Sequence, residues 1–348
     1  MRANGGDPGR DLDRYVSEAA AADLTLDPGR RRLSPVAGRV GPLDAEDAAW
    51  SWLESERAGL RAAVETAHAH GHHDRVWWLC EALWNLYRRR GLYDDWIATH
   101  ELGVDAAVHC RDPAAEARMR TQLGHALLGR DRVEDAAGEF TAAREAARSA
   151  GHRPGEEEAA EGLGRALLDL GRRDAAVAIL EDAVRLAEEE RDPRALLSAR
   201  RGLGDAAVDE GDLDRAVELL RPLPGGFLAL DPPDRDGRAR ALTGLGRACV
   251  RARRPDTAVN FFGQGLVIMW AERAVEDQAA LWCGFADAAR VRRDPDAERA
   301  ALAEALPLYE AVGSPRAAGV AARLRNLGAG RAGRSGRPEA VRPCGGPS

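Results

Sequence analysis

The sequence predicts an all-α protein: a right-handed solenoid of about six helical hairpins, each about 40 residues long, with a C-terminal capping helix. A Leu-Gly pair recurs along the chain at intervals of 40, 40 and 42 residues. Twelve residues after each glycine comes an alanine, and four residues later a large apolar residue. Self-similarity at this period indicates stacked supersecondary units rather than one globular core. The glycines are Gly124, Gly164, Gly204 and Gly246, the alanines Ala136, Ala176, Ala216 and Ala258, and the large residues Phe140, Leu180, Leu220 and Phe262.

The composition supports this fold class and excludes several functions. Aromatic residues make up 5% of the chain and charged residues 31%, which is typical of extended helical proteins. All 50 basic residues are arginine, so a P-loop and Schiff-base chemistry are excluded, because both need a lysine amine. The net charge of −7 argues against nucleic-acid binding by the protein as a whole. We therefore expect neither a nucleic-acid partner nor a cofactor.

The spacing of the cysteines and the lack of long apolar stretches indicate the cellular compartment of the protein. The five cysteines are widely spaced and form no C-x-x-C motif, which fits a reducing compartment rather than a disulfide framework or a zinc site. Residues 1–14 lack the apolar stretch of a signal peptide, and no run has the length of a membrane span. We expect a cytoplasmic protein with no membrane contact.

In chain order, the N-terminal part divides into three segments. Residues 1–10 are rich in glycine and proline and are predicted to be disordered. Residues 11–43 are expected to form a short helix, to about Leu26, and then a linker that carries three prolines and the basic run Arg30-Arg31-Arg32. Residues 44–111 are rich in tryptophan and are predicted to be helical.

The tryptophan-rich segment is interpreted as a degenerate first repeat. Its apolar spacing predicts a helix that ends near Gly71, followed by helices over about 75–90 and 93–108. Projected back from Gly124, the 40-residue period falls on Trp84. A tryptophan therefore stands where the later repeats have glycine.

Residues 112–328 form the predicted repeat array and its cap. Asp-Pro pairs, such as Asp192-Pro193, place an N-cap side chain before a proline suited to the first helical turn. The proline-rich stretch 222–236 predicts a shortened second helix and a kink in the array. A capping helix is expected over 315–327, and residues 329–348 are predicted to be a disordered basic tail.

The repeat pattern resembles the tetratricopeptide repeat, in which small side chains at the helix crossing let the two helices approach. The usual period is 34 residues, so a period of 40 adds about six residues to each helical pair, or roughly 9 Å of rise. The segments "DRYVSEAAAADLTLDPGRR", "AAWSWLESERAGLRAAV" and "ALWNLYRRRGLYDDWIATHELGVDAA" sharpen the comparison. They look like the junction after the ATPase core in SARP-type and large ATP-binding LuxR-type bacterial activators. The resemblance covers about residues 11–328.

This resemblance has a limit that affects function. Those regulators carry a DNA-binding domain and a nucleotide-binding core, and the sequence has the motifs of neither. DNA binding and ATP hydrolysis are therefore not carried over. What remains resembles the sensory or partner-binding arm of such a regulator.

In tetratricopeptide proteins, the first helix of each hairpin lines a concave groove. Arginines are prominent at the C-terminal end of the predicted groove, which would suit an acidic peptide or another anionic ligand through bidentate contacts. A solvated helix face with incidental charge is the competing interpretation. By register, the groove residues are Trp78, Asn85, Arg88, Arg118, His125, Arg165, Arg201, Asp205, Arg240, Arg247 and Arg251.

Other residue clusters have plainer interpretations. The histidines within residues 68–73 suggest a metal site, but they lack cysteine or carboxylate at motif spacing, so a polar turn is favoured. Six of the eight tryptophans lie between Trp50 and Trp96, where they would build either a ligand pocket or, as we favour, a core. Trp78 is the expected exception.

Two cysteine–histidine pairings are the only candidates for catalysis. They are Cys80 with His100 and Cys110 with His109, and neither has a third, orienting group. The sequence thus favours a non-catalytic protein-binding scaffold in bacterial transcriptional or signalling control. The alternatives are a small-molecule sensor that uses the tryptophan-rich half, and a fragment of a split ATPase-type regulator.

Overall fold

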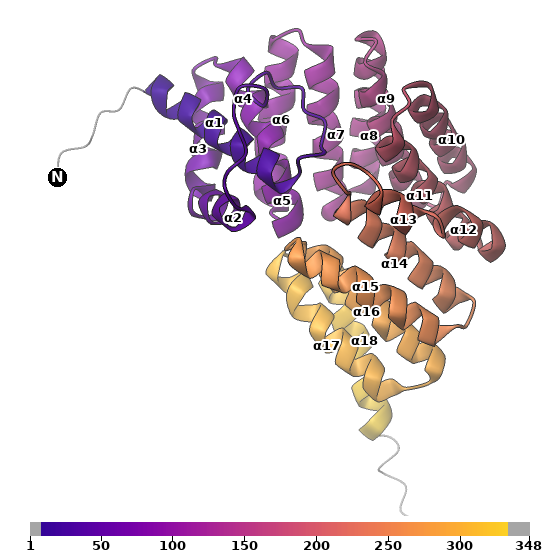
Figure 1. Cartoon of the computed structure of the whole chain (residues 1–348). Coiled ribbons are helices and arrows are strands. Elements are labelled where there is room, and N and C mark those ends of the chain that lie inside the picture. The colour runs from indigo at the N-terminus through magenta and orange to yellow at the C-terminus, as the bar shows by residue number, and fades with distance from the viewer. Residues whose placement is uncertain (1–7, 333–348) are drawn as a thin grey trace, which may run out of the picture.

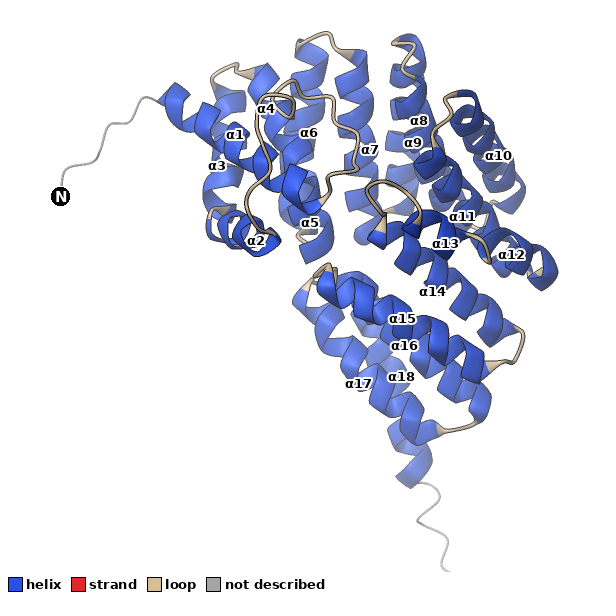
Figure 2. Ribbon diagram, viewed as in Figure 1, coloured by secondary structure: helices blue, strands red, loops and turns tan. Residues whose placement is uncertain are grey.

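The computed structural model describes residues 8–332, which form helices and turns with no β-strand (Figure 2). The predicted stack of helical hairpins is confirmed (Figure 1). The N-terminal helices are α1 (Pro8–Leu26), α2 (Glu46–Ser55), α3 (Arg57–Ala69), α4 (His73–Ala82), α5 (Trp84–Arg90) and α6 (Tyr93–His109). The array continues with α7 (Pro113–Gly129), α8 (Val133–Ser149), α9 (Arg153–Asp169), α10 (Arg173–Glu189), α11 (Pro193–Glu210), α12 (Leu213–Leu220), α13 (Leu223–Leu228), α14 (Arg235–Arg251), α15 (Pro255–Ala271), α16 (Val275–Arg292) and α17 (Pro295–Ala311). The capping helix is α18 (Arg316–Ala332).

The hairpins begin where the sequence places helix caps. The side chain of Asp192 accepts hydrogen bonds from the backbone N–H groups of Arg194 and Ala195, and Pro193 occupies the first turn of α11. Asp112 caps α7 in the same way. These carboxylates satisfy amides that a helix leaves unpaired at its N-terminus, so these two hairpins start at fixed residues.

Glycine lies where the two helices of a hairpin cross. A Cβ atom added to Gly164 would lie 2.6 Å from the side chain of Leu180, in the second helix of the same hairpin. A Cβ atom added to Gly202, in the next hairpin, would lie 2.7 Å from the same Leu180. Each large residue of a second helix is therefore held between two glycines. The other sets are Gly124, Phe140 and Gly162; Gly204, Leu220 and Gly244; and Gly246, Phe262 and Gly284.

Two predicted helices are broken in the structure. The helix expected to end near Gly71 stops at Glu56, whose carboxylate accepts a hydrogen bond from Tyr15 Oη (2.9 Å). Since α1 packs on both α2 and α3, two shorter helices follow its surface. The helix expected over 75–90 breaks at Leu83, because Trp84 and Trp96 meet there with ring centroids 5.2 Å apart. These two rings need more room than the glycine and alanine of the later hairpins.

Helix ends also differ from the prediction. Residues 8–10 and 329–332 are helical where disorder was expected. Proline suits the first turn of a helix, which is consistent with the start of α1 at Pro8. The remaining residues of the two predicted disordered ends lie outside the described part of the chain. The shortened second helix before 222 is confirmed as α12, but the predicted break over 222–236 contains the short helix α13, and α14 begins at Arg235.

The predicted linker is a strap, the name used here for residues 27–43. It has no helix, but it runs along the first helices of the array (Figures 1 and 2). Ser34 and Val36 are buried, and Gly29 lies against Arg194 of α11. The strap therefore packs on the array instead of spacing two independent segments.

The array curves back onto its own beginning. The Arg88 guanidinium on α5 lies 3.0 Å from the Asp236 carboxylate on α14. The buried Arg89 pairs with Glu272 at the end of α15, and α5 packs on α16. No helix in the described part of the chain is long and apolar enough to cross a membrane.

Candidate partner-binding face

The inner face consists of the side chains that α4 and α5, which together form the first helix of the first hairpin, and the first helices α7, α9, α11, α14 and α16 present to one another. His125 of α7 is its central residue. Burial, and to a smaller extent nearby arginine charges, lower the pKa of His125 to about 3, so the ring is neutral at pH 7. The arginines are Arg240, Arg88, Arg201 and Arg165, which come from four other helices. The structure thus brings together five of the predicted residues.

Carboxylates neutralise most of these arginines. Arg201 Nη2 lies 2.6 Å from Glu161, one hairpin earlier, and Arg201 Nη1 lies 3.2 Å from Asp205. Arg247 bonds to the same Asp205 (3.2 Å) and to Asp209 (2.5 Å). The paired residues stand about one repeat apart, so the ion pairs form a ladder across neighbouring first helices.

The ladder continues at the end where α14 meets α5. Arg240 lies 3.0 Å from Asp236 and 3.1 Å from Asp277, and Asp236 also pairs with Arg88. Burial acts to raise the pKa of Asp236, but Arg88 and Arg240 outweigh it and hold that pKa well below its usual range. A partner on the inner face therefore meets preorganised, mutually paired charges rather than free cations.

The N-terminal end of the predicted groove is covered, which corrects the expectation that its residues face solvent. Asn85 is fully buried and donates to Asp23 of α1 (2.8 Å). Arg118 is 6% exposed, pairs with Glu158 (2.7 Å) and donates to a strap carbonyl. Trp78 is half-buried, and its Nε1 has no partner. The cause is that α1 and the strap lie over α4, α5 and α7, which local sequence periodicity does not reveal.

Two of the predicted arginines stay accessible. The side chain of Arg165 is 48% exposed and pairs only within its helix, with Asp169 (3.1 Å). Arg251 is exposed, and no ion pair joins it to another described residue. These are the positions where an anion meets least competition from resident carboxylates.

Sequence reasoning missed an aromatic residue of the inner face, besides ladder carboxylates such as Asp236 and Asp277. Trp84 was interpreted as a core residue, yet it is half-buried, its ring centroid lies 5.5 Å from that of His125, and the Arg88 guanidinium lies 5.7 Å above it. Its position in the repeat register, one turn before Arg88, was the available signal. It adds an aromatic surface to a charged site.

The other sequence candidates have structural roles. His68 bonds to Asp105 (2.6 Å), and the rings of His73 and His109 stack with centroids 4.4 Å apart. No group of at least three His, Cys, Asp or Glu residues among those described is arranged to hold a metal. Burial raises the pKa of the Cys80 thiol, whose Sγ donates to the Thr99 carbonyl. Cys80 and His100 therefore do not form a nucleophile–base pair.

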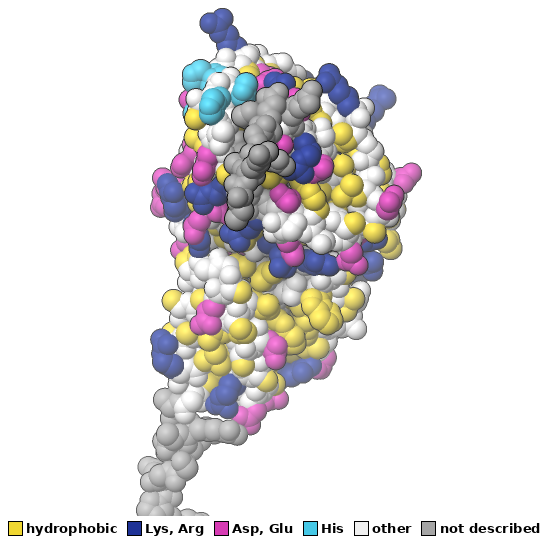
Figure 3. All heavy atoms as spheres, turned by 90° about the vertical axis from the view of Figure 1, so that its left-hand side faces the viewer, with side chains coloured by type: hydrophobic (Ala, Val, Ile, Leu, Met, Phe, Trp, Pro, Cys, Tyr) yellow, Lys and Arg dark blue, Asp and Glu magenta, His cyan; other side chains and the backbone are white. Residues whose placement is uncertain are grey.

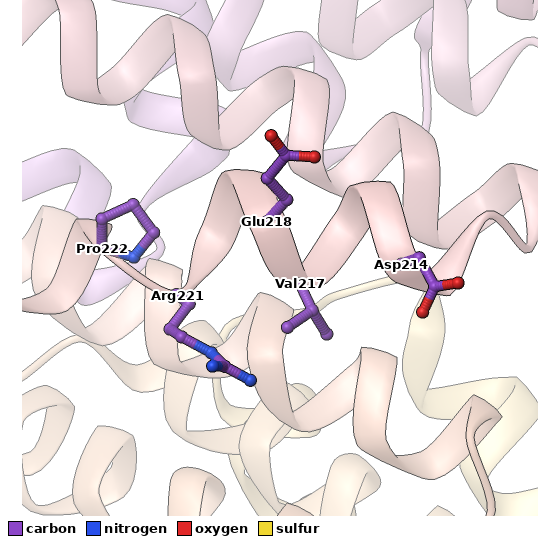
Figure 4. Close-up of a pocket in the computed structure, with 5 residues that line it drawn as sticks. All are labelled: Asp214, Val217, Glu218, Arg221 and Pro222. Atoms are coloured by element: carbon purple, nitrogen blue, oxygen red, sulfur yellow. The ribbon is translucent and has the colours of Figure 1, made fainter.

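The surface hollows lie away from the inner face. One of about 430 Å³ is lined by Asp214, Val217, Glu218, Arg221 and Pro222 of α12 and the turn after it. In Figure 4 these side chains fan out from one helix instead of converging. A second hollow lies at the turn between α9 and α10. Neither brings together groups that would hold a small molecule.

The outer surface differs between the two ends of the array. Val267 and Trp270 of α15 are 70% and 75% exposed. Asp256 is the single charged residue of this helix. Figure 3 shows apolar side chains gathered on this lower part of the molecule, below a belt of charged residues.

Comparison with known proteins agrees with this geometry. Residues 158–190 match the model of the tetratricopeptide repeat family. A solved Rap protein complexed with competence and sporulation factor shares 11% identity over 93% of this chain and 99% of its own, with a TM-score of 0.57. NprR in complex with its cognate peptide NprX shares 12% identity over 95% and 86%, with a TM-score of 0.53. The chain thus contains a segment that matches the tetratricopeptide repeat family, and at these identities the two structures show its helical-repeat fold alone.

A relative of known sequence points to the wider class. Regulatory protein AfsR of Streptomyces griseus is 30% identical over 234 residues, which cover 55% of this chain. The match spans 24% of that relative. The chain therefore resembles the repeat region of bacterial regulators, as its sequence predicted, and corresponds to a minor part of this one.

Proposed function

We propose that this chain is a non-catalytic scaffold whose inner face binds a protein or peptide partner, and that it acts as the interaction arm of a bacterial transcriptional or signalling regulator in the cytoplasm. The observation that carries the proposal is the set of charged side chains that four helices bring around His125, where Arg88, Arg165, Arg201 and Arg240 pair with resident carboxylates. Side chains on rigid, packed helices lose little entropy on binding, so such a face suits recognition.

The charge distribution favours a partner of mixed charge. At the C-terminal end, Arg247 and the exposed Arg251 favour an acidic stretch through bidentate contacts. The resident carboxylates would reject a ligand that is anionic throughout. The Rap and NprR structures with bound factor and peptide support an extended protein segment as the occupant.

A capture experiment tests the proposal. The full chain is immobilised, and proteins retained from a bacterial lysate are quantified by mass spectrometry. The inner-face variant carries Arg201→Gln, Arg247→Gln and Arg251→Gln, substitutions that remove charge without reversing it. We expect retention of the specific partner to fall about tenfold, since several charge-assisted contacts are lost.

The control variant carries Arg132→Gln, Arg185→Gln and Arg215→Gln, whose side chains are about half exposed on second helices or the turns before them. It should retain the partner at the wild-type level. Circular dichroism establishes that both variants keep their helicity. Equal retention by all three proteins would rule out the inner face as the binding surface.

A further inference from the structure

The strap meets the inner face as an extended peptide would. The carboxylate of Glu81 on α4 accepts two consecutive strap amides, from Leu33 (2.9 Å) and Ser34 (2.8 Å). Arg118 of α7 donates to the main-chain carbonyl of Arg31 (3.3 Å). These contacts use main-chain atoms, so they would hold another extended segment equally well.

The guanidinium of Arg31 occupies the next position along the inner face, beside α11. Arg31 Nη2 of the strap lies 2.7 Å from the Asp192 carboxylate of α11. The two side chains are 42% and 22% exposed, so this pair contributes little stability. Asp192 also caps α11, which fixes its carboxylate in place.

A buried carboxyl group beside this pair has one oxygen atom without a hydrogen-bond partner. Glu157 of α9 is 3% exposed, and its Oε1 has no hydrogen-bond partner. Burial raises its pKa, Glu161, Glu158 and Asp192 raise it further, and Arg31 opposes them. An unpartnered buried oxygen is costly, and a second guanidinium would satisfy it.

The strap is bonded to α1 near both of its ends, and at its far end the Leu43 amide donates to Thr25 Oγ1 (2.7 Å). Arg30 and Arg32 pair with the buried Asp23 of α1, at 2.9 Å and 2.6 Å, with side chains that are less than one-tenth exposed. These contacts hold the start of the strap to its own helix. The contacts to the array through residues 31–34 are thus the ones a competitor would replace.

We propose that the inner face between α4 and α11, around Glu81, Glu157 and Asp192, docks an extended arginine-bearing segment of a protein partner, and that residues 31–34 fill this site until the partner displaces them. The inference rests on the proposed function and adds the chemistry of the partner at the N-terminal end. The acidic groups of Glu157 and Asp192 select an arginine side chain, and Glu81 and Arg118 bind the main chain of an extended segment. The strap, which carries such a sequence, is the built-in competitor.

The test uses a fluorescent peptide with the sequence of residues 27–36 and the full-length chain. A tethered strap competes at an effective concentration in the millimolar range, so the wild type should bind the peptide weakly. Arg31→Ala weakens the competitor by one exposed ion pair, and we expect about fivefold tighter peptide binding. In that background, Asp192→Asn and Glu157→Gln should each reverse the gain.

The controls separate charge from structure. Asparagine caps a helix as well as aspartate does, so Asp192→Asn removes the charge and keeps the cap. Asp212→Asn makes the same exchange at the cap of α12, away from the strap, and should change nothing. A peptide with glutamate at the Arg31 position should not bind. In the wild type, excess peptide should speed hydrogen exchange at the amides of Leu33 and Ser34.

Two results would overturn the inference: equal peptide affinity for the wild type and Arg31→Ala, or binding that does not respond to Asp192→Asn. If the peptide does not bind while lysate capture still depends on Arg201, Arg247 and Arg251, only the proposed docking site is contradicted. If lysate capture by the inner-face variant equals that by the wild type, the proposed function itself is contradicted.

Discussion

The first interface between hairpins and the later ones solve the same packing problem with different chemistry. In the later interfaces, Phe140, Leu180, Leu220 and Phe262 insert between two glycines each. At the equivalent positions of the first interface stand His100 and Gln122, both buried, with His100 Nε2 3.0 Å from Gln122 Oε1. An apolar contact is thus replaced by a buried polar pair at one place in the array.

This difference shows what the repeat requires. The array tolerates either a large apolar group against no side chain, or two polar side chains that bond to each other, because both arrangements fill the space at the crossing. In the polar arrangement His100 Nε2 bonds to Gln122 Oε1, while Gln122 Nε2 has no partner. A large apolar side chain placed against a buried polar side chain would leave that polar side chain without its partner and would destabilise the interface. The N-terminal hairpin also packs Trp84 on Trp96 where the others have glycine and alanine, so it is sterically distinct throughout.

The largest expected effect comes from filling a glycine position. A Cβ atom on Gly284 would lie 2.7 Å from the ring of Phe262, which is 1% exposed and cannot swing away. We expect Gly284→Ala to lower the free energy of unfolding by about 3 kcal/mol, since overpacking outweighs the gain in helix propensity. Urea denaturation followed by circular dichroism measures it. A neutral effect would contradict the close-approach role of this glycine.

A double-mutant cycle tests whether the two interface types are interchangeable. His100→Phe alone would place a ring against the Gln122 side chain, and Gln122→Gly alone would leave His100 Nε2 without a partner. Each should cost about 2 kcal/mol. The double variant recreates the later interfaces, so its loss should be smaller than the sum by at least about 1 kcal/mol. Simple additivity would show that the two positions do not share one contact.

The stability of the first interface between hairpins, unlike that of the later apolar ones, should depend on pH through its buried histidine. Burial lowers the pKa of His100 to about 4, although bonds to Gln122 and the Trp96 carbonyl oppose the shift. Between pH 6.5 and 4 the unfolded chain therefore binds a proton that the folded chain does not, so stability falls as pH falls through that window. From pH 7 to 5.5, the wild type should lose about 1 kcal/mol more than the double variant. His125 titrates alike in both proteins, so parallel pH profiles would place the sensitivity outside His100.

The sequence predicts the repeated helical hairpins better than it predicts the contacts that form when the array curves back onto its N-terminal helices. Leu-Gly pairs and Asp-Pro caps predict the hairpins because their causes are local. The spacing also contained the second glycine of each set, such as Gly202, but only the contact with Leu180 shows its purpose. The covered state of Asn85 and the partners of Arg88 depend on α1, the strap and α14, which meet these residues only when the array has curved. Proline and glycine identify the strap as a loop without saying where it lies.

The smallest expected effect has the opposite sign and sharpens the glycine argument. Gly263 lies on α15, next to Phe262, and a Cβ atom added there meets nothing within 4 Å. Gly263→Ala should therefore stabilise the protein by up to about 1 kcal/mol, because alanine restricts the unfolded chain and favours the helix. A rise in the urea midpoint at unchanged slope would register this gain. Gly263 lies beside Phe262 on α15, and Gly284 lies against the Phe262 ring from α16, so a loss of similar size at both would mean that these helices require glycine for backbone reasons. Opposite signs would mean that space at the crossing decides which glycines the array needs.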